Sequence, residues 1–272
     1  CIHKKNGMKY KMLVLDLDDT LLTDDHTISN ENAAMLSKAQ ELGVFIILAS
    51  GRPTPAMTAF AKELHLDNSY MISYNGAVIT DLKEDKVIFE QTLTQEQIHE
   101  LYDYSLKSKT HIITYVNGKI VSETDSEYIE IEKKITGLEH NKVLSFKAEV
   151  QSSAVKCILL EEPSYLKEVE KDLKATMPHL SVSMSKPFFL EVAQNGIDKG
   201  ASIKFLAEKL DILQSEIIAV GNAGNDLTMI EYAGLGVWVD NVDPELRDKA
   251  NFIVASNNDH GVAEVVRRFI LN

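Results

Sequence analysis

The sequence has few cysteines and lacks any long run of hydrophobic residues. Its two cysteines, Cys1 and Cys157, cannot form a disulfide framework, and Cys157 lies in the apolar run 155–160, where we expect a small buried side chain. The apolar runs are far shorter than the ~20 residues that a membrane-spanning helix needs. We also find no segment with the pattern of a secretory signal peptide. These features predict a soluble protein of the reducing cytoplasm, with no membrane partner.

Positive charge is also scarce in this chain. It has 28 Lys and Arg residues against 41 Asp and Glu residues, which gives a formal net charge of −13, and no basic cluster reverses this locally. Such a surface repels the phosphate backbone of nucleic acids, so we expect no nucleic-acid partner. Glycine and proline are too infrequent for a fibrous or disordered chain, and the hydrophobic share of 44% is that of an ordinary globular protein.

Short apolar runs alternate along the chain with longer segments that have helical spacing. The apolar runs predict strands, which we place at 12–16, 44–49, 70–73, 188–192, 217–220 and 235–239. The segments with helical spacing predict helices, which we place at 29–42, 53–64, 199–210 and 262–271. Alternating strands and helices predict an α/β fold built on a doubly wound, mostly parallel sheet.

The middle third of the chain has a different pattern. After the charged segment 81–86 the alternation stops, and Asn117-Gly118 between two apolar runs is typical of a tight antiparallel hairpin. We therefore predict a separate α+β module at 85–186, inserted into one sheet domain formed by 8–84 and 187–272. Residues 1–7 are polar and do not begin with Met, so we interpret them as an irregular extension or a cloning remnant.

Three acidic residues crowd the end of the first predicted strand. Asp16, Asp18 and Asp19 lie within four residues of one another, and like charges a few ångströms apart repel. At the carboxyl end of a strand in a doubly wound sheet they would lie where ligands bind, and a divalent cation would neutralise them. The alternative is an acidic turn exposed to solvent, because short acidic motifs are common after strands.

A second polar group follows the next predicted strand. Ser50, Gly51 and Arg52 offer a hydroxyl, a backbone amide and a guanidinium, which are donors suited to phosphate oxygens. In a doubly wound sheet they would lie at the same edge as Asp16. Taken alone, a Ser-Gly pair after a strand also fits the turn that starts the next helix.

Two further polar groups lie near the end of the chain. Lys199 opens a predicted helix, where the helix dipole disfavours a cation unless an anion lies nearby; the alternative is a solvated surface lysine. The loop 221–226 contains Asn222, Asn225 and Asp226, which carry oxygen ligands of the type that magnesium prefers, although Asn225 or Asp226 could simply cap a helix. Four polar groups converging on one sheet edge favour a shared site over four separate structural explanations.

The ordered set of these motifs resembles the haloacid dehalogenase superfamily. The residues that carry the resemblance are Asp16-Leu17-Asp18-Asp19-Thr20, Ser50-Gly51-Arg52-Pro53, Lys199 and Gly221-Asn222-Ala223-Gly224-Asn225-Asp226. Within that superfamily, the segment 72–77 and the insertion after it resemble the Cof-type sugar-phosphatase-like hydrolases. The resemblance covers almost all of residues 8–272, including the closing motif 259–262. It implies a hydrolase core formed by both chain ends and a cap domain that closes over the site and selects the substrate.

The resemblance also implies a reaction and a role for each motif residue. It implies a Mg²⁺-dependent phosphatase that acts on small phosphorylated metabolites, such as sugar phosphates, through an aspartyl-phosphate intermediate. Asp16 would be the nucleophile, and Asp18 would protonate the leaving oxygen and later deprotonate the hydrolytic water. The implied phosphate-binding residues are Ser50, Gly51, Arg52, Lys199 and Asn225. The implied metal ligands are Asp16, Asp18 through its carbonyl, Asn222 and Asp226.

The chain departs from the family pattern at two positions of these motifs. Asn222 stands where the family usually has Asp; it keeps an oxygen ligand but removes one negative charge, so we expect weaker Mg²⁺ affinity. Asp19 replaces the commoner Gly, a change that we expect to leave the chemistry intact. Two alternatives remain, a metabolite- or phosphate-binding regulatory protein with weakened catalysis and a phosphosugar mutase. The sequence names neither the physiological substrate nor the oligomeric state.

Overall fold

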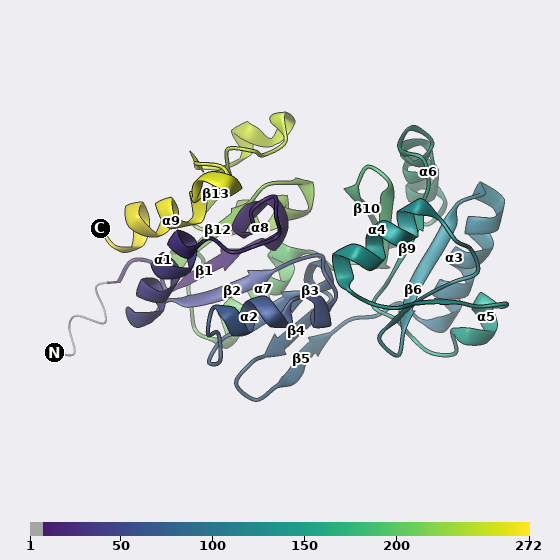
Figure 1. Cartoon of the computed structure of the whole chain (residues 1–272), viewed down its shortest axis with the longest axis horizontal. Helices are drawn as coiled ribbons and strands as arrows, with labels where there is room; N and C mark the ends of the chain where they lie inside the picture. Colours follow the sequence, from purple (N-terminus) through teal and green to yellow (C-terminus); the bar gives the residue numbers. More distant parts are fainter. Residues whose placement is uncertain (1–7) are drawn as a thin grey trace. The chain divides into compact units, whose positions relative to one another are not determined.

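The computed structural model describes residues 8–272, so the extension that we expected at 1–7 lies outside the described residues. Contacts between residues divide the chain into two compact units (Figure 1). The first unit is formed by the chain up to Ile88 and by Asp198–Asn272, and the second by Phe89–Ile197. The sequence led us to expect the same arrangement of an inserted module, but with boundaries at 84/85 and 186/187.

The first unit is built on an eight-stranded sheet with the strand order β14-β13-β12-β1-β2-β3-β4-β5, whose last strand, β5, continues into the first residues of the second unit. Its strands are β1 (Met12–Leu15), β2 (Phe45–Ala49), β3 (Tyr70–Ser73), β4 (Val78–Asp81), β5 (Lys86–Glu90), β12 (Ile217–Gly221), β13 (Leu235–Val239) and β14 (Phe252–Val254). Neighbouring strands from β14 to β3 pair in parallel, and β4 is antiparallel to β3. The mostly parallel α/β sheet that the alternating pattern predicts is therefore confirmed.

All four residues of β1 are inaccessible to solvent. Since neighbouring side chains of a strand point to opposite faces, both faces of the sheet are covered at β1. The helices of the first unit are α1 (Asn30–Glu41), α2 (Thr58–Glu63), α7 (Lys199–Lys209), α8 (Leu227–Tyr232) and α9 (Gly261–Val265). Side chains of α1, α2 and α9 join the hydrophobic cluster that includes Leu13 and Leu15 of β1. Helices α7 and α8 contact each other. Their packing brings the start of α7 close to the loop that follows β12.

Local capping explains where several of these helices start. The Ser29 hydroxyl accepts a hydrogen bond from the Asn32 amide at the start of α1, and the Asp198 carboxylate does the same for Ala201 at the start of α7. Two predicted helices are broken into shorter pieces. The segment 53–64 starts with a 3₁₀ turn at Thr54–Ala56 before α2, and the segment after α9 continues as a wider turn at Val266–Ile270.

The second unit contains a six-stranded sheet with the order β10-β11-β9-β6-β7-β8. Its strands are β6 (His111–Val116), β7 (Lys119–Ser122), β8 (His140–Lys142), β9 (Lys156–Leu160), β10 (Leu180–Lys186) and β11 (Phe189–Gln194), and its helices are α3 (Gln95–Ser108), α4 (Glu127–Thr136), α5 (Phe146–Glu149) and α6 (Pro163–Thr176). All neighbours pair antiparallel except β7 and β8. Asn117 and Gly118 both have positive φ between β6 and β7, which confirms the predicted hairpin.

One predicted strand belongs to the second sheet, whereas we expected it in the first. The run predicted as a strand at 188–192 is β11, and it pairs with β9 and β10 inside the inserted segment. The assignment of this run to the first sheet was therefore wrong, because an apolar run does not reveal which strands it pairs with. The chain returns to the first unit only at Asp198, directly before α7.

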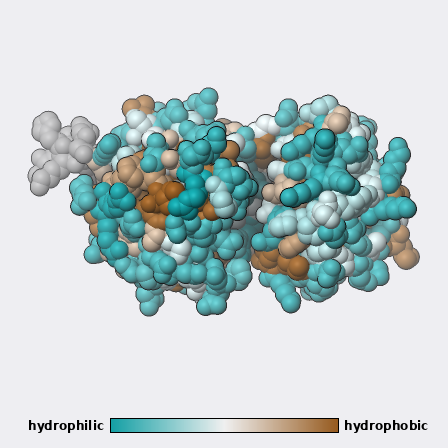
Figure 2. Space-filling model, turned by 90° about the horizontal axis from the view of Figure 1, so that it is seen from above, coloured by the Kyte–Doolittle hydropathy of each residue, from teal (hydrophilic) through white to brown (hydrophobic). Residues whose placement is uncertain are grey.

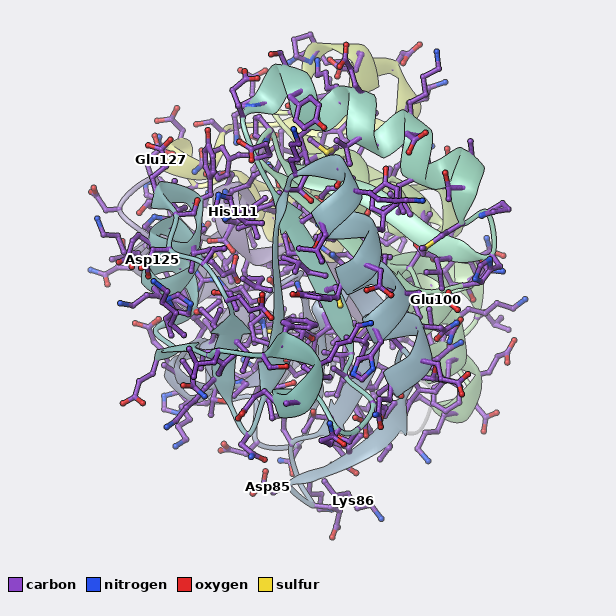
Figure 3. All side chains as sticks on the ribbon, turned by 90° about the vertical axis from the view of Figure 1, so that its right-hand side faces the viewer. Asp85, Lys86, Glu100, His111, Asp125 and Glu127 are labelled. Carbon is purple, nitrogen blue, oxygen red and sulfur yellow. The ribbon has the colours of Figure 1, made fainter. Side chains whose placement is uncertain are left out.

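The surface carries most of the charged side chains. Figure 2 shows a largely hydrophilic face with small hydrophobic patches. Glu100 on α3 and Glu127 at the start of α4 are exposed in the second unit (Figure 3). Within residues 8–272 we find no helix that is both long enough and apolar enough to cross a bilayer. Cys157 is buried as expected, and this burial raises the pKa of its thiol to about 12.

Candidate active site

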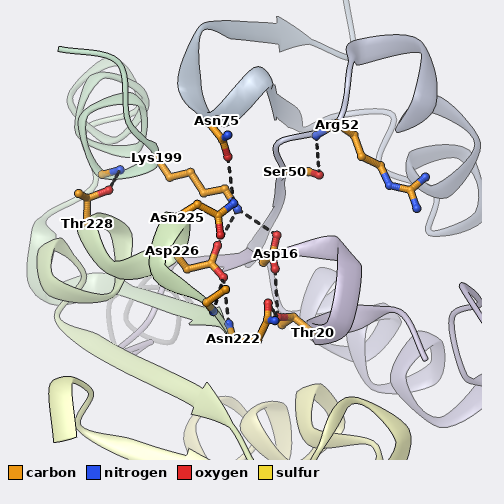
Figure 4. Close-up of polar contacts among 12 residues, drawn as sticks. Asp16, Thr20, Ser50, Arg52, Asn75, Lys199, Asn222, Asn225, Asp226 and Thr228 are labelled. Carbon is orange, nitrogen blue, oxygen red and sulfur yellow. Dashed lines mark hydrogen bonds and ion pairs between the residues drawn. The ribbon is translucent and has the colours of Figure 1, made fainter. Parts of the chain in front are cut away.

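The polar groups predicted from the sequence come together at one edge of the first sheet (Figure 4). Asp16 directly follows β1, Ser50 directly follows β2 and Asn222 directly follows β12, so all three lie at the carboxyl ends of parallel strands. Lys199 is the first residue of α7 and reaches the same edge. Ligands bind at this edge in open α/β sheets.

Lys199 forms the centre of a buried ion cluster with two carboxylates. Its Nζ lies 2.9 Å from Asp16 Oδ1 and 2.6 Å from Asp226 Oδ1. The lysine and Asp226 are fully buried, and Asp16 is 5% exposed. Burial lowers the pKa of Lys199, but the two carboxylates outweigh it, so the net pKa is raised and the lysine is charged. The alternative of a solvated surface lysine is therefore wrong.

Asp16 is in an environment that resists ionisation. Burial, followed by the negative charge of Asp226, raises the pKa of Asp16 to about 8, against the opposing effect of Lys199. The second oxygen, Oδ2, accepts a hydrogen bond of 3.2 Å from the Thr20 hydroxyl. An additional positive charge beside Oδ2 would favour the ionised, nucleophilic form of this carboxylate.

Asp226 holds the loop after β12 in place. Its Oδ2 accepts hydrogen bonds from the backbone amides of Asn222 at 2.9 Å and Ala223 at 3.2 Å, while its Oδ1 is bonded to Lys199. Gly221 is needed at the strand end, because a Cβ there would lie 2.7 Å from the Asp226 carboxylate carbon. Both oxygens of Asp226 thus have partners within the protein. Its expected role as a metal ligand stays a prediction.

Three oxygen atoms form a candidate cation site around Asn222. The amide oxygen of Asn222 accepts a 3.0 Å hydrogen bond from Thr20 and otherwise faces the acceptor oxygens of Asp16 and the Asp18 carbonyl. Turning the amide by 180° would instead place its nitrogen 2.7 Å from Asp16 Oδ2 and 3.2 Å from the Asp18 carbonyl. Oxygens in such close contact are favourable only around a cation or with the amide turned.

This oxygen set fits Mg²⁺, which takes oxygen ligands and usually keeps several waters. Over residues 8–272 we find no group of three or more His, Cys, Asp or Glu side chains placed to hold a metal ion. The set found here has a single carboxylate, on Asp16, and its other members are the carbonyl of Asp18 and the amide of Asn222. It is therefore less negative than a set with two carboxylates.

The loop after β2 provides donors beside Asp16. Ser50 is 2% exposed, and its Oγ accepts a 3.0 Å hydrogen bond from the backbone amide of Arg52. A Cβ on Gly51 would lie 3.1 Å from the side-chain amide of Asn75, so the backbone and this amide are in close contact. The same Asn75 amide oxygen accepts a 3.1 Å hydrogen bond from Asn225. Asn75 thus joins the loop of Ser50 to the loop of Asn225.

Sequence reasoning missed this role of Asn75. Its segment, 72–77, was used for the family resemblance but was given no function. Tyr74, Asn75 and Gly76 all have positive φ, a strained conformation for the two non-glycine residues. An Asn-Gly pair one residue after a buried strand was the available signal, because these two residue types tolerate left-handed backbone.

The structure gives Arg52 a partner that the sequence did not indicate. Its Nε and Nη2 each lie 2.8 Å from one carboxylate oxygen of Asp18, which is a two-point contact. Figure 4 shows the guanidinium turned away from Asp16 and Lys199. Asp19 next to this pair has φ of 61°, which explains why Gly would also suit that position.

Comparisons with known proteins show which family the chain resembles along its length. The family model of haloacid dehalogenase-like hydrolases matches residues 13–266. A Bacillus subtilis (strain 168) protein named putative phosphatase YxeH is 34% identical over 269 residues, covering 96% of this chain and 99% of that protein. Another from the same strain, named 5-amino-6-(5-phospho-D-ribitylamino)uracil phosphatase YcsE, is 28% identical over 268 residues, covering 98% and 99%.

Solved structures show the same likeness. The crystal structure of a haloacid dehalogenase-like hydrolase from Bacteroides thetaiotaomicron has a TM-score of 0.87 and 32% identity, covering 96% of this chain and 99% of that one. The crystal structure of TM0651 from Thermotoga maritima has a TM-score of 0.83 and 27% identity, covering 97% and 100%. The family match over 13–266, together with these likenesses along nearly the whole chain, shows that the protein belongs to the haloacid dehalogenase-like hydrolases.

Proposed function

We propose that this protein is a Mg²⁺-dependent phosphatase that hydrolyses small phosphorylated metabolites through an aspartyl-phosphate on Asp16. The observation that carries the proposal is the buried Asp16 carboxylate, bonded to Lys199 through one oxygen and lying against the side-chain amide of Asn222 with the other. Relatives along the whole chain have names of phosphatases, and one name specifies a phosphorylated ribityl compound.

Each residue of the site has a chemical task in this reaction. Asp16 attacks phosphorus, and the bond from phosphorus to the leaving oxygen breaks. Lys199 and the hydroxyl of Ser50 stabilise the charge on the transferring phosphoryl oxygens. Asp18 gives its proton to the leaving oxygen and then takes one from the water that hydrolyses the aspartyl-phosphate.

Oxygens of Asp16, Asn222 and the Asp18 carbonyl would hold Mg²⁺, with Asp226 as the further predicted ligand. The bound cation supplies charge that screens the repulsion between the Asp16 carboxylate and the anionic phosphoryl group. The protein's contribution is to keep these oxygens together, which it does through Thr20 and through the Asp226 bonds to the loop after β12.

The direct test is turnover of p-nitrophenyl phosphate by purified protein with Mg²⁺ and with EDTA. We expect turnover with Mg²⁺ that EDTA abolishes, and a phosphoryl group on Asp16 in intact-protein mass spectrometry of acid-quenched samples. Asp18→Asn should accumulate this adduct, because the water that removes it lacks a base. Turnover without any phosphorylated protein, or phosphorylation of another residue, would contradict the proposal.

One observation favours a second candidate, a phosphate-binding regulatory protein with weak catalysis. With its amide turned, Asn222 donates to Asp16 and the Asp18 carbonyl and satisfies the oxygen cluster without a cation. The two candidates differ in turnover. Tight binding of inorganic phosphate by calorimetry, with no hydrolysis of p-nitrophenyl phosphate under Mg²⁺, Mn²⁺ or Co²⁺, would select the binding protein.

A further inference from the structure

Arg52 is fixed by contacts from several elements of the first unit. Beside the two 2.8 Å contacts to Asp18, its Nη1 donates to the Ala56 carbonyl at 3.3 Å. Its guanidinium carbon lies 5.3 Å from the ring centroid of Phe60, a distance typical of a cation–π contact. The side chain is only 9% exposed. An arginine held in this way has one geometry, unlike a flexible surface arginine.

The consequence for Asp18 is that its carboxylate has a defined position. Asp18 itself lies in an irregular turn, with φ of −62° and ψ of 128°, and its side chain is 28% exposed. The imidazole of His26 approaches to 3.7 Å, but it is 64% exposed and therefore gives little restraint. The two-point contact with Arg52 is the strong restraint on the direction of this carboxylate.

The same geometry determines what the guanidinium does at the site. A guanidinium binds a phosphoryl group through two parallel N–H groups, as it binds a carboxylate. In Arg52 the Nε and Nη2 pair is bonded to Asp18, whereas Lys199 is the cation bonded to Asp16. The positive charge nearest to the expected nucleophile therefore belongs to Lys199.

We propose that Arg52 is a positioning residue that holds the Asp18 carboxyl group beside the leaving oxygen, and that it does not bind the phosphoryl group. The inference rests on the proposed function, in which Asp18 is the proton donor. As the bond from Asp16 to phosphorus forms, the bond to the leaving oxygen breaks; that oxygen keeps the electron pair and takes the proton of Asp18. Asp18 enters this step as the carboxylic acid and leaves it as the carboxylate, which Arg52 binds at both oxygens in the structure. While one oxygen carries the proton, the contact of Arg52 with the other keeps the direction of the acid.

Leaving groups that need a proton should therefore depend on Arg52 more than those that do not. A nitrophenolate departs as a stable anion, whereas the alkoxide of glycerol 2-phosphate needs protonation, and a positioned acid contributes about 10²–10⁴-fold to such a step. The quantity to compare is kcat/KM, since it reports the steps up to departure of the alcohol. Inorganic phosphate serves as the probe of phosphoryl binding.

The experiment measures kcat/KM on both substrates, and inhibition by inorganic phosphate, for Arg52→Ala, Arg52→Lys and Asp18→Asn. For Arg52→Ala we expect glycerol 2-phosphate to lose about 10-fold or more relative to p-nitrophenyl phosphate, with phosphate inhibition changed less than about 3-fold. Arg52→Lys should recover part of the loss, as should free guanidinium added to Arg52→Ala. The matched control is Lys11→Ala. This variant also removes an ion pair of the first unit, the one between Lys11, directly before β1, and Glu216, directly before β12.

The double variant separates positioning from a general structural effect. If Arg52 acts through Asp18, then Arg52→Ala in the Asp18→Asn background should cause no further selective loss on glycerol 2-phosphate. Equal losses on both substrates, or phosphate inhibition weakened about 10-fold or more, would overturn the inference while leaving the proposed function intact. If the unaltered protein hydrolysed neither substrate with Mg²⁺, the proposed function would fail and this inference with it.

Discussion

Each of the two units contains a buried lysine beside two carboxylates, and the two clusters are built differently. In the first unit, Lys199 is bonded to Asp16 and Asp226. In the second unit, Lys156 of β9 pairs with Glu191 of the neighbouring strand β11, and the charge of Lys156 also acts on Glu132 of α4. All six side chains are at least nine-tenths buried.

The clusters differ in the parts of the chain that hold them. The carboxylates of the first follow strand ends, and Asp226 accepts from two backbone amides. Those of the second lie on a strand and in a helix, and Glu132 accepts a 2.9 Å hydrogen bond from the Tyr115 hydroxyl. Buried charge alone therefore does not distinguish the proposed catalytic cluster from the cluster in the second unit. A more specific sign of a catalytic site is that the carboxylates lie at the carboxyl edge of parallel strands and accept hydrogen bonds from backbone amides.

The largest expected effect on this comparison comes from replacing Asp16, the proposed nucleophile. Asp16→Asn should lower kcat on p-nitrophenyl phosphate by at least about 1,000-fold, because the amide cannot form the aspartyl-phosphate. Its counterpart in the second cluster, Glu132→Gln, should keep kcat within about 10-fold of the unaltered protein. Steady-state kinetics with circular dichroism of both variants would check this. Comparable losses in the two variants would remove the distinction between the clusters.

Removing either lysine should lower the free energy of unfolding, but only the removal of Lys199 should strongly slow phosphoryl transfer. Lys199→Met and Lys156→Met each leave buried carboxylates without their cation, which costs about 3–5 kcal/mol. Lys199→Met should also lower kcat by about 100-fold or more, because the positive charge proposed to stabilise the transferring phosphoryl group is lost. Urea unfolding at neutral pH in EDTA measures the first effect, and kinetics the second. If Lys199→Met unfolded at the same urea concentration as the unaltered protein, the ion pairs of Lys199 with Asp16 and Asp226 would not stabilise the fold.

The Asn222→Asp variant tests how charge at the strand edge controls Mg²⁺ binding. A second carboxylate beside Asp16 should lower the Mg²⁺ concentration for half-maximal activity, by about 10-fold, because the site gains a negative charge. The same change should lower the Tm in EDTA, since like charges then meet without a cation. Magnesium titrations and thermal melts of both proteins measure this. An unchanged or greater magnesium requirement would contradict the account.

The smallest expected effect is a pH dependence in the second cluster. Burial raises the pKa of Glu132 above its usual 4.5, against the opposing charge of Lys156. A raised folded-state pKa means that the stability linked to Glu132 is complete below pH 4.5 and is lost as pH rises through the folded value. Glu132→Gln has no such loss. The Tm of this variant relative to the unaltered protein should therefore increase from pH 4.5 upward, and a constant difference in melts across that range would count against this reading.

Much of the fold follows from short-range patterns in the sequence. Alternating apolar runs and helical segments are enough to predict the parallel sheet, because strands joined by helices pair in parallel. The Asn117-Gly118 pair is enough for the hairpin between β6 and β7, since few residues accept its backbone angles. The same reasoning fails for β11, whose partners β9 and β10 were not encoded in its own pattern.

The sequence by itself determined that Asp16, Ser50 and the loop 221–226 would meet, because consecutive parallel strands end at one edge. Only the tertiary structure decided which polar atoms pair there. It paired Arg52 with Asp18, and it bonded Lys199 to Asp16 across 183 residues of chain. Such pairings depend on ångström-scale placement of side chains, which residue type and order leave open.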